Sequence, residues 1–510
     1  MLFASLEFIF LFLPVALLGY FAIGRLGPTK GILWLFGVSL FFYGWWNPKY
    51  LILLITSILV NYFVGKAIVR SRDQWKARWA PNLMFALGLS FNLGLLIYYK
   101  YFDFLESLIY QLLGRTHTAD PFFLPLGISF FTFTQIAFLV DMKQGAKEEK
   151  GFFSYALFVT YFPHLIAGPF LNYRDMGRQF KDEKIYFFNP QTFSVGLFIF
   201  SIGLFKKVLF ADPVSVLVEP VFSMAATNHL VDFFSAWKGA LAYTLQLYFD
   251  FSGYSDMAVG ISLLFGIKLP INFFSPFKSC SIIDFWKTWH MTLSAFIQDY
   301  LFTPLVRSFV IPRLAAKKIK KMKSRHIVLP VVVSMTICGL WHGANTTFIV
   351  FGFLHGSLLA INHLWRDHGA NLKSKLAGTG VFWTCIAWAL TFTSVVVCFV
   401  VFRAPNLDTA KVIIAGLFRP SWEGPVNLAD FRLIFILLVV ALGLPNAYQL
   451  TREQKPTLKF NVPASPWGRA PTLQWSPQLA WSLAGSFLAA LSIIWLILAE
   501  KSVEFLYFQF

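Results

Sequence analysis

The stretch "VFWTCIAWALTFTSVVVCFVVF" (381–402) runs for 22 residues without a charged side chain. A helix of about 20 mainly apolar residues spans the hydrocarbon core of a bilayer, and other runs in this chain reach a similar length. In lipid every backbone N–H and C=O must be paired within the protein, which leaves only helices or closed barrels. Strands of a membrane barrel alternate apolar and polar residues, and these runs do not alternate. The runs therefore predict an all-α, polytopic membrane protein.

The charge of the chain agrees with this interpretation. Charged residues make up 13% of the 510 residues, whereas soluble proteins carry about 25%. The net charge of +18 would suggest a nucleic-acid partner in a soluble protein. Because Lys and Arg of membrane proteins gather in cytoplasmic loops, we expect the lipid bilayer as a partner and no nucleic acid. The four cysteines lack CxxC spacing, which indicates small buried side chains and no metal site.

Basic loops predict how the chain is oriented in the membrane. Arg25 and Lys30 follow the first apolar run, which lacks the basic start and cleavage site of a signal peptide and is expected to be a retained helix. The loop after it is therefore inside and the N-terminus outside. The densest basic run, "IPRLAAKKIKKMKSRH" (311–326), is predicted to be cytoplasmic. Alternation from there places the end of the last helix, 477–498, and so the C-terminus, outside.

One apolar segment conflicts with simple alternation. "GFFSYALFVTYFPHLIAGPF" (151–170) is long enough to cross the membrane, but basic residues precede it in 143–150 and follow it in 174–187. Two cytoplasmic loops cannot flank one full crossing. Its two prolines and Gly168 favour a broken or re-entrant element, which survives at membrane depth only where it lines a protein cavity. His164 lies on this element.

In all we expect about 11–14 membrane helices, including short or re-entrant ones. The loops 403–431 and 450–476 are too short to form domains of their own. Residues 1–510 are therefore expected to form a single multi-pass domain.

Two histidines stand in the apolar stretch "CGLWHGANTTFIVFGFLHG" (338–356). Polar side chains are expensive in a membrane, so each is a candidate for function. His342 lies where "HGAN" interrupts two apolar runs, and burial favours a neutral imidazole that can accept a proton. The alternative is a structural histidine bonded to a neighbouring helix. For His355, 13 residues further on, we expect a packing or hydrogen-bonding role.

A second polar cluster occupies "IIDFWKTWHMTLSAFIQDYLFTPL" (282–305). Trp286 and His290 are four residues apart, so a continuous helix would present them on one face, as it would Lys287 and Met291. The mixture of Trp, Lys, His and Asp also suits an interfacial belt.

Two carboxylates interrupt the apolar run "LQLYFDFSGYSDMAVG" (245–260). Asp250 and Asp256 lie on either side of a glycine and need donors close by. Tyr248 and Lys287 are the candidates that the sequence offers. Catalytic signatures such as GxSxG, HExxH, the P-loop and GxGxxG are absent from the sequence.

Together these segments resemble a known family. The blocks "PLGISFFTFTQIAFLVDM", "YFPHLIAGPF", "LQLYFDFSGYSDMAVG", "NFFSPFKSCSIIDFWKTWHMTLSAF", "GLWHGANTTFIVFGFLHG" and "VFRAP" follow one another between about residues 125 and 405. They are similar to the membrane-bound O-acyltransferase (MBOAT) superfamily. Within it they resemble the bacterial branch of alginate O-acetylation membrane proteins.

The resemblance implies helices around a central funnel or tunnel in the bacterial cytoplasmic (inner) membrane, with C-terminal helices and a tail over 430–510. A thioester donor, acetyl-CoA, would enter from the cytoplasm, and no metal or permanently bound cofactor is implied. The acceptor would be a hydroxyl of an extracytoplasmic polysaccharide such as alginate, reached directly or through extracytoplasmic acetyltransferase partner proteins. The family's catalytic histidine falls on His342 and its second important histidine on His290. The residues expected along the acyl path or in substrate binding are Trp341, Asn345, Asp256 and Lys287.

The chain also departs from that branch. Lys287–Thr288 stands where relatives usually have two basic residues, and Gln298 stands where Arg is common. These departures leave room for an acceptor other than alginate. The alternatives are transfer of D-alanine or another acyl group to a cell-surface polymer, or transport of a polysaccharide or lipid-linked sugar. Transporters often contain internal pseudo-repeats, and none is evident here.

The end of the chain, "EKSVEFLYFQF" (500–510), allows two interpretations. Its aromatic residues suit an anchor at the outer membrane surface. The segment "FLYFQF" also resembles the C-terminal motif of the small partner protein in teichoic-acid D-alanylation. By that resemblance Tyr507 would take the acyl group near His342 and pass it to an extracytoplasmic transferase.

Overall fold

The computed structural model of the protein describes residues 1–74, 79–115, 124–146, 151–227, 229–315, 323–368, 380–419, 428–459, 473–499 and 505–506. Every regular element within these ranges is a helix, so the all-α prediction is confirmed. Eight helices of the described residues are long and apolar enough to cross a membrane: Lys49–Asp73, Ala80–Tyr110, Pro190–Ala226, Ser324–His342, Thr346–Asp367, Gly380–Arg403, Leu428–Gln454 and Leu479–Leu498.

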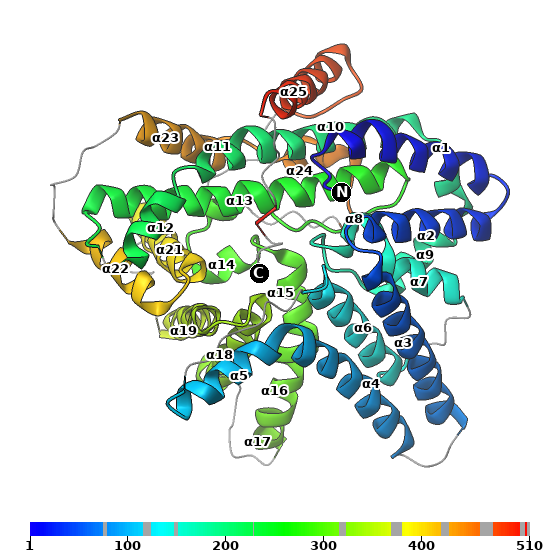
Figure 1. The fold of residues 1–510 in the computed structure, drawn as a ribbon, viewed down its shortest axis with the longest axis horizontal. Coiled ribbons are helices and arrows are strands. Elements are labelled where there is room, and N and C mark those ends of the chain that lie inside the picture. Colours follow the sequence, from blue (N-terminus) through cyan, green and yellow to red (C-terminus); the bar gives the residue numbers. More distant parts are fainter. Residues whose placement is uncertain are drawn as a thin grey trace.

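The N-terminal third forms the blue-to-cyan side of the molecule (Figure 1). It consists of η1 (Phe8–Phe12), α1 (Leu13–Gly24), α2 (Pro28–Gly44), α3 (Lys49–Gln74), α4 (Ala80–Leu96), η2 (Ile97–Tyr101), α5 (Phe102–Leu112) and α6 (Ile128–Lys143). Helices α3, α4 and α6 pack against one another. Helix α4 continues through the π-helical segment η2 into α5, and this run reaches the α18–α19 region.

The middle third contains the buried centre of the fold. Its elements are α7 (Phe152–Thr160), α8 (Phe162–Leu165), α9 (Tyr173–Phe180), η3 (Glu183–Tyr186), α10 (Pro190–Phe205), η4 (Lys206–Ala211), α11 (Asp212–Ser215), α12 (Glu219–Ala226) and α13 (Phe233–Leu264). Helix α13 crosses the middle of the molecule and is buried along most of its length (Figure 1). It packs closely on α10, because a Cβ atom at Gly203 would lie 2.6 Å from the carbonyl oxygen of Gly253. Small residues of this kind let membrane helices approach closely.

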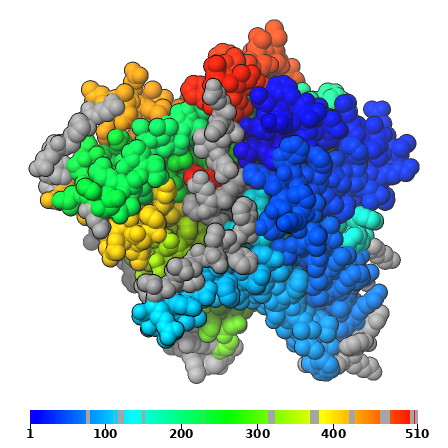
Figure 2. Space-filling view, in the orientation of Figure 1, coloured from blue at the N-terminus to red at the C-terminus, as the bar shows by residue number. Residues whose placement is uncertain are grey.

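The C-terminal third begins with short elements and ends with long helices. The elements are η5 (Pro276–Lys278), α14 (Ile282–Trp286), α15 (Met291–Ile297), η6 (Gln298–Phe302), α16 (Thr303–Phe309), α17 (Ile311–Ala315), α18 (Ser324–His342), α19 (Thr346–His368), α21 (Gly380–Arg403), α22 (Leu407–Phe418), α23 (Leu428–Gly443), α24 (Ala447–Leu450), η7 (Arg452–Gln454) and α25 (Leu479–Leu498). Helices α18 and α19 form a tightly packed hairpin. Helix α25 packs mainly on α10 and η4 and lies at the rim of the molecule (Figures 1 and 2).

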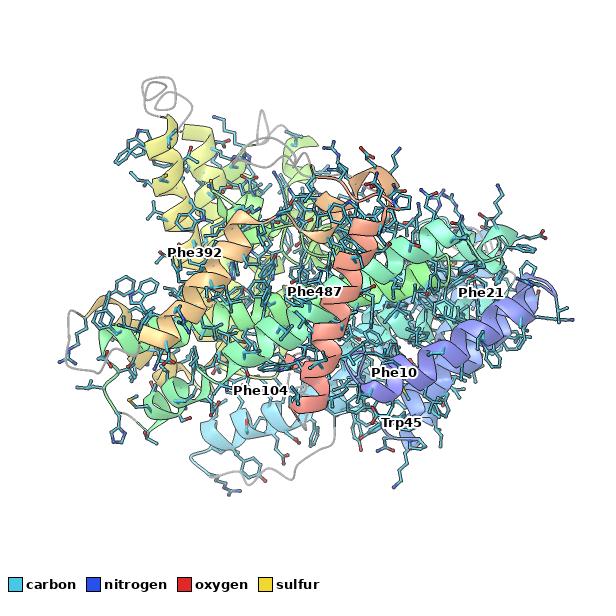
Figure 3. All side chains as sticks on the ribbon, turned by 90° about the horizontal axis from the view of Figure 1, so that it is seen from above. Phe10, Phe21, Trp45, Phe104, Phe392 and Phe487 are labelled. Atoms are coloured by element: carbon cyan, nitrogen blue, oxygen red, sulfur yellow. The ribbon has the colours of Figure 1, made fainter. Side chains whose placement is uncertain are left out.

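Large apolar side chains cover the outside as well as the inside of this fold. Phe10 lies on η1, Trp45 follows the end of α2 and Phe487 lies on α25 (Figure 3), and all three are more than half exposed. Soluble monomers seldom expose wide apolar surfaces. This distribution is that of a multi-pass membrane protein whose outer surface contacts lipid.

The segment 151–170 is broken, as its sequence predicts. Helix α7 ends at Thr160, and Tyr161 leaves the helical conformation with ψ 105° before the single turn of α8. His164 donates from Nε2 to the carbonyl oxygen of Phe158 at 2.7 Å, which gives one of the freed carbonyls a partner. The segment is buried almost throughout, so its irregular backbone is enclosed by protein.

Candidate active site

His342 is the last residue of α18 and is buried, with 7% of its surface exposed. The next residue, Gly343, is extended, so the helix stops there and α19 returns alongside. A Cβ atom at Gly339 would lie 2.1 Å from the carbonyl oxygen of Phe348, so only glycine permits this close hairpin. The rings of Trp341 and Phe402 lie 4.9 Å and 5.2 Å from the imidazole. The imidazole is therefore enclosed by aromatic side chains.

The end of α18 is held by two side chains from η2, in the N-terminal third of the chain. Lys100 Nζ lies 2.6 Å from the carbonyl oxygen of Trp341 and 3.1 Å from that of His342. Tyr101 donates its hydroxyl hydrogen to the carbonyl oxygen of Leu340 at 3.0 Å. The sequence analysis missed Lys100, although a lysine within the apolar run "LGLLIYYKYF" is the kind of signal that marks a functional residue in a membrane.

His290 occupies an unusual backbone conformation between α14 and α15. Its φ is 42° and its ψ 51°, in the left-handed region that residues other than glycine seldom adopt. The prediction that Trp286 and His290 share one helix face is therefore wrong, because α14 ends at Trp286 and a new helix begins at Met291. The turn is stabilised by Asn272, whose carbonyl oxygen accepts from Met291 N at 2.8 Å.

The same asparagine determines the tautomer of His290. Asn272 Oδ1 is an acceptor, and it receives hydrogen bonds from Thr292 Oγ1 at 2.8 Å and from His290 Nδ1 at 3.0 Å. In the neutral imidazole the proton therefore lies on Nδ1 and the lone pair on Nε2. Among the described residues, His290 Nε2 is buried without a hydrogen-bond partner. This nitrogen can accept a hydrogen bond from a substrate.

His355 forms a third buried imidazole, on α19. Trp286 donates from Nε1 to His355 Nδ1 at 3.2 Å, so the neutral imidazole carries its proton on Nε2. The ring also packs edge-on against Phe351 at 4.7 Å. Both contacts are those of a packing and hydrogen-bonding residue.

The two histidines expected to act in catalysis belong to one neighbourhood. His290, His355 and Lys100 are all close enough to His342 to interact with it electrostatically. The ring of Phe170 contacts His290 at 6.0 Å and Trp341, the neighbour of His342, at 5.6 Å. Residues from α18, α19 and the α14–α15 turn thus meet in one aromatic interior.

The carboxylates of α13 have different partners from those that the sequence suggested. Asp256 pairs with Lys206 at 2.6 Å, and Asp250 pairs with Lys207 at 2.6 Å. The proposed pairing with Lys287 is wrong, because that side chain is 61% exposed and pairs with Asp284 on the next turn back. Lysines 206 and 207 were overlooked, although they form a "KK" pair inside the apolar run "SIGLFKKVLF".

Two further residues that were expected along the acyl path, Trp341 and Asn345, lie close to His342 in the sequence but have different contacts. Trp341 is buried directly beside it. Asn345 lies in the short link to α19, where its side-chain amide donates to the carbonyl oxygen of Pro405 at 2.9 Å and joins the link to the end of α21.

Tyr507 lies outside the described residues, but the two residues just before it are placed. Phe505 is 2% exposed and stacks on Tyr254 of α13 at 4.5 Å. Leu506 donates its backbone N–H to Asp250 Oδ2 at 2.9 Å. Phe505 also contacts Phe251, whose ring lies 4.8 Å from His290. These two tail residues are therefore part of the interior, and a surface anchor does not describe them.

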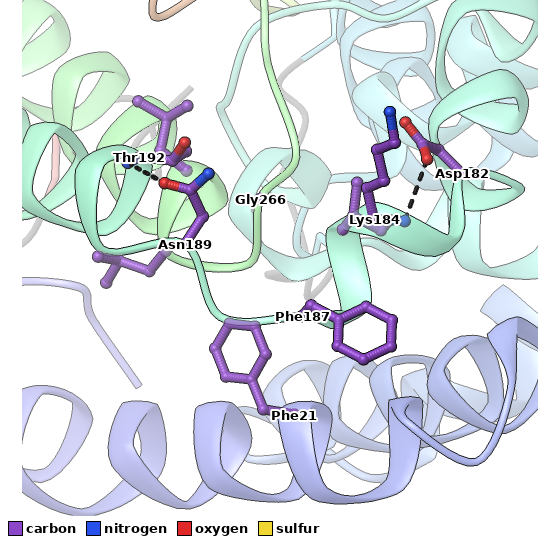
Figure 4. A pocket seen from close by; sticks show the side chains of 10 residues that line it. Phe21, Asp182, Lys184, Phe187, Asn189, Thr192 and Gly266 are labelled. Atoms are coloured by element: carbon purple, nitrogen blue, oxygen red, sulfur yellow. Dashed lines mark hydrogen bonds between the residues drawn. The ribbon is translucent and has the colours of Figure 1, made fainter.

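A separate cavity of about 190 Å³ lies between η3, α10 and the end of α13 (Figure 4). Its polar groups already serve local structure. Asn189 accepts from Thr192 N at 3.0 Å to cap α10, and Asp182 accepts from Lys184 N at 3.1 Å. None of the residues expected in catalysis lines this cavity.

Comparison with known proteins adds independent information. The family model for MBOAT, the membrane-bound O-acyltransferase family, matches residues 17–402, which include His290 and His342. The chain is 40% identical to a peptidoglycan O-acetyltransferase of Helicobacter pylori over 82% of this chain and 80% of that protein. It is 34% identical to a probable alginate O-acetylase, AlgI, of Azotobacter vinelandii over the full length of both. It is 29% identical to a teichoic acid D-alanyltransferase of Streptococcus thermophilus over 54% of this chain and 68% of that protein.

Proposed function

Because this chain belongs to the membrane-bound O-acyltransferase family, we propose that it moves an acetyl group from cytoplasmic acetyl-CoA to a hydroxyl of an extracytoplasmic polysaccharide. The chain is a multi-pass membrane O-acyltransferase. Our proposal concerns its donor, its acceptor and the route that the acyl group takes between them. The observation that carries it is the buried neighbourhood of His342 and His290 inside the matched region, where His290 Nε2 has no hydrogen-bond partner among the described residues.

His342 acts as the general base in this proposal. It takes the proton of the acceptor hydroxyl while the hydroxyl oxygen attacks the thioester carbonyl and the CoA thiolate leaves. A positioned base of this kind contributes about 10²–10⁴-fold to the rate. The thioester is already activated, so the step uses no metal.

His290 suits a role in orienting the acceptor. The hydrogen bond of His290 Nδ1 to Asn272 leaves Nε2 as an acceptor. A second hydroxyl of the acceptor, next to the one that reacts, can donate to this nitrogen, whereas polarising the acyl carbonyl would need a donor. The geometry therefore favours orientation of the acceptor over polarisation of the thioester.

Two polysaccharides are candidates for the acceptor. The sequence blocks suggest alginate, and full-length relatives carry that description. Identity to the peptidoglycan O-acetyltransferase is higher, at 40% against 34%. Together with the departures at Lys287–Thr288 and Gln298, this makes peptidoglycan the second candidate. D-alanyl transfer remains an alternative through the relative of Streptococcus thermophilus.

We propose in addition that the acyl group travels through Tyr507 to an extracytoplasmic transferase. The buried positions of Phe505 and Leu506 beside α13 support this route, because they bring the chain into the interior just before Tyr507. The proposed membrane is the bacterial cytoplasmic membrane, with both termini outside. In that orientation the basic segment 311–326 is cytoplasmic, where it can attract the phosphates of CoA.

The test is to incubate the purified protein in lipid nanodiscs with acetyl-CoA and follow release of the CoA thiol with and without fragments of alginate or peptidoglycan. Acceptor-dependent thiol release supports direct acetyl transfer, and the fragment that becomes acetylated identifies the acceptor, whereas thiol release without an acetylated fragment supports the relay. Thiol release from a D-alanyl carrier protein supplied in place of acetyl-CoA, with none from acetyl-CoA, would favour the D-alanyl alternative. Absence of acyl chemistry in a folded preparation that moves sugar across liposomes would favour a transporter.

A further inference from the structure

The carbonyl end of α18 lacks the usual means of ending a helix. The last carbonyl groups of a helix have no partner within it, and helices often satisfy them with a left-handed glycine and two backbone hydrogen bonds. Gly343 instead has φ −167° and ψ 159°. The carbonyls of Trp341 and His342 receive their hydrogen bonds from a different helical run, at Lys100.

The amine of Lys100 is held at the end of α18 by hydrogen bonds. Its Nζ has three neighbours: the carbonyl oxygens of Trp341 and His342 and, at 3.1 Å, Ser129 Oγ. Carbonyl oxygens can only accept, so at least two N–H groups of Lys100 are directed at the end of α18. The hydroxyl of Ser129 can accept or donate, so the three contacts form with either protonation state of the amine.

An amine suits this place. The carbonyl end of a helix carries about half a negative charge, which hydrogen-bond donors and cations next to it stabilise. Lys100 also lies in the π-helical segment η2, together with Tyr101, which bonds the preceding carbonyl of α18. Such π-helical turns often occur at functional sites. Two consecutive residues of one turn thus hold three consecutive carbonyls of another helix.

We propose that Lys100 is a positioning residue for His342. Because its amine donates to the carbonyl oxygen of His342 itself, Lys100 sets where α18 ends and so where the imidazole lies. This inference rests on the proposed role of His342 as base. A displacement of about 1 Å in a reacting group can lower a rate by about 100-fold, so the hydrogen bonds of Lys100 matter for turnover more than for substrate binding.

The experiment compares Lys100→Met, which keeps the length and removes charge and donors, with Lys100→Arg, which keeps both. Lys143→Met is the matched control, because Lys143 lies over the ring of Phe85 away from the site. We expect kcat for acetyl-CoA-dependent acylation to fall about 10- to 100-fold in Lys100→Met with KM changed less than about twofold. Lys100→Arg should recover part of kcat, and the control should match wild type.

A merely structural role would lower the amount or the apparent Tm of folded protein and leave kcat per folded molecule unchanged, and that result would overturn the proposal. Unchanged kcat in Lys100→Met would do the same. If Lys100→Met does not accumulate as folded protein, Lys100→Gln, which keeps an uncharged donor group, is judged by the same criteria. His342→Ala is measured in parallel. Full activity of that variant refutes the proposed base, whereas an inactive His342→Ala beside a fully active Lys100→Met refutes only the role of Lys100.

Discussion

The imidazole of His342 projects from the final residue of α18, so its removal interrupts no helix. We predict that His342→Ala loses about 10²–10⁴-fold in acetyl transfer, the usual contribution of a general base, while its folded yield and apparent Tm stay near wild type. His290→Ala should be severe but less so, because binding energy can replace part of an orienting contact. Thiol release from acetyl-CoA measures both, and His363→Ala on α19 is the control. Wild-type turnover of a folded His342→Ala protein would contradict the role.

Tyr507 gives a prediction that separates the relay from the anchor. Tyr507→Phe keeps the aromatic ring and removes only the hydroxyl, which at neutral pH is mostly protonated and needs a base to accept an acyl group. We therefore expect acylation of the polymer to fall, measured as ester content of the polysaccharide in cells. Tyr110→Phe, at a partly buried position at the end of the Ala80–Tyr110 run, is the control. Full polymer acylation by Tyr507→Phe would support an anchor instead.

The histidines were found from sequence blocks, whereas their supports were not. His342 and His290 lie inside motifs that resemble a family, and an imidazole in an apolar run is a candidate for function because polar side chains are expensive in a membrane. The role of Lys100 depends on the carbonyls of a helix that begins 224 positions later in the chain, at Ser324. Trp286 and His290 were placed on one helix face because a continuous helix was assumed, and the left-handed conformation of His290 breaks that helix.

Among the helices, the broken element 151–170 has a consequence that labelling can detect. We predict that 143–146 and 174–184 are accessible from the same side of the membrane, because basic residues flank the element and α7 and α8 are too short to cross. Single cysteines placed at Gln144 and Lys181 and treated with a membrane-impermeant thiol reagent, in a variant without the four native cysteines, measure this. Labelling from opposite sides would show a full crossing. A cysteine in the loop before α25 serves as the reference for sidedness.

Apolar runs predicted the long helices well. The expected spans 381–402 and 477–498 became Gly380–Arg403 and Leu479–Leu498, because length and hydropathy alone define a helix that lipid surrounds. The irregular elements were not predictable in this way. The π-helical segments η2 and η4 carry Lys100, Lys206 and Lys207 to partners on other helices, and such contacts do not appear in local periodicity.

At the scale of the whole molecule, buried ion pairs connect η4 with α11 and α13. Lys207 is 6% exposed and pairs with Asp250 and with Asp212 at 2.8 Å. We predict that Lys207→Met lowers the free energy of unfolding by about 3–5 kcal/mol, because it leaves buried carboxylates without a cation. Thermal unfolding in detergent measures the fall in apparent Tm. Lys411→Met, which breaks an exposed pair with Asp408, should change it little, and an equal effect of both variants would contradict the argument.

Helix α25 has little protein around it: 6% of its most apolar stretch of 18 residues is buried inside the protein, on the side where Gly485 lies against Phe198 of α10. The acyl chains of membrane lipids must therefore supply most of the packing that holds α25 against the rest of the protein. Extraction into short-chain micelles would remove that support before it disturbed α13 or the α18–α19 hairpin. The tail at Phe505 and Leu506 follows α25, so the choice of solubilising agent decides whether a preparation keeps its interior complete. Nanodiscs, which retain annular lipid, are thus the suitable setting for measuring this enzyme.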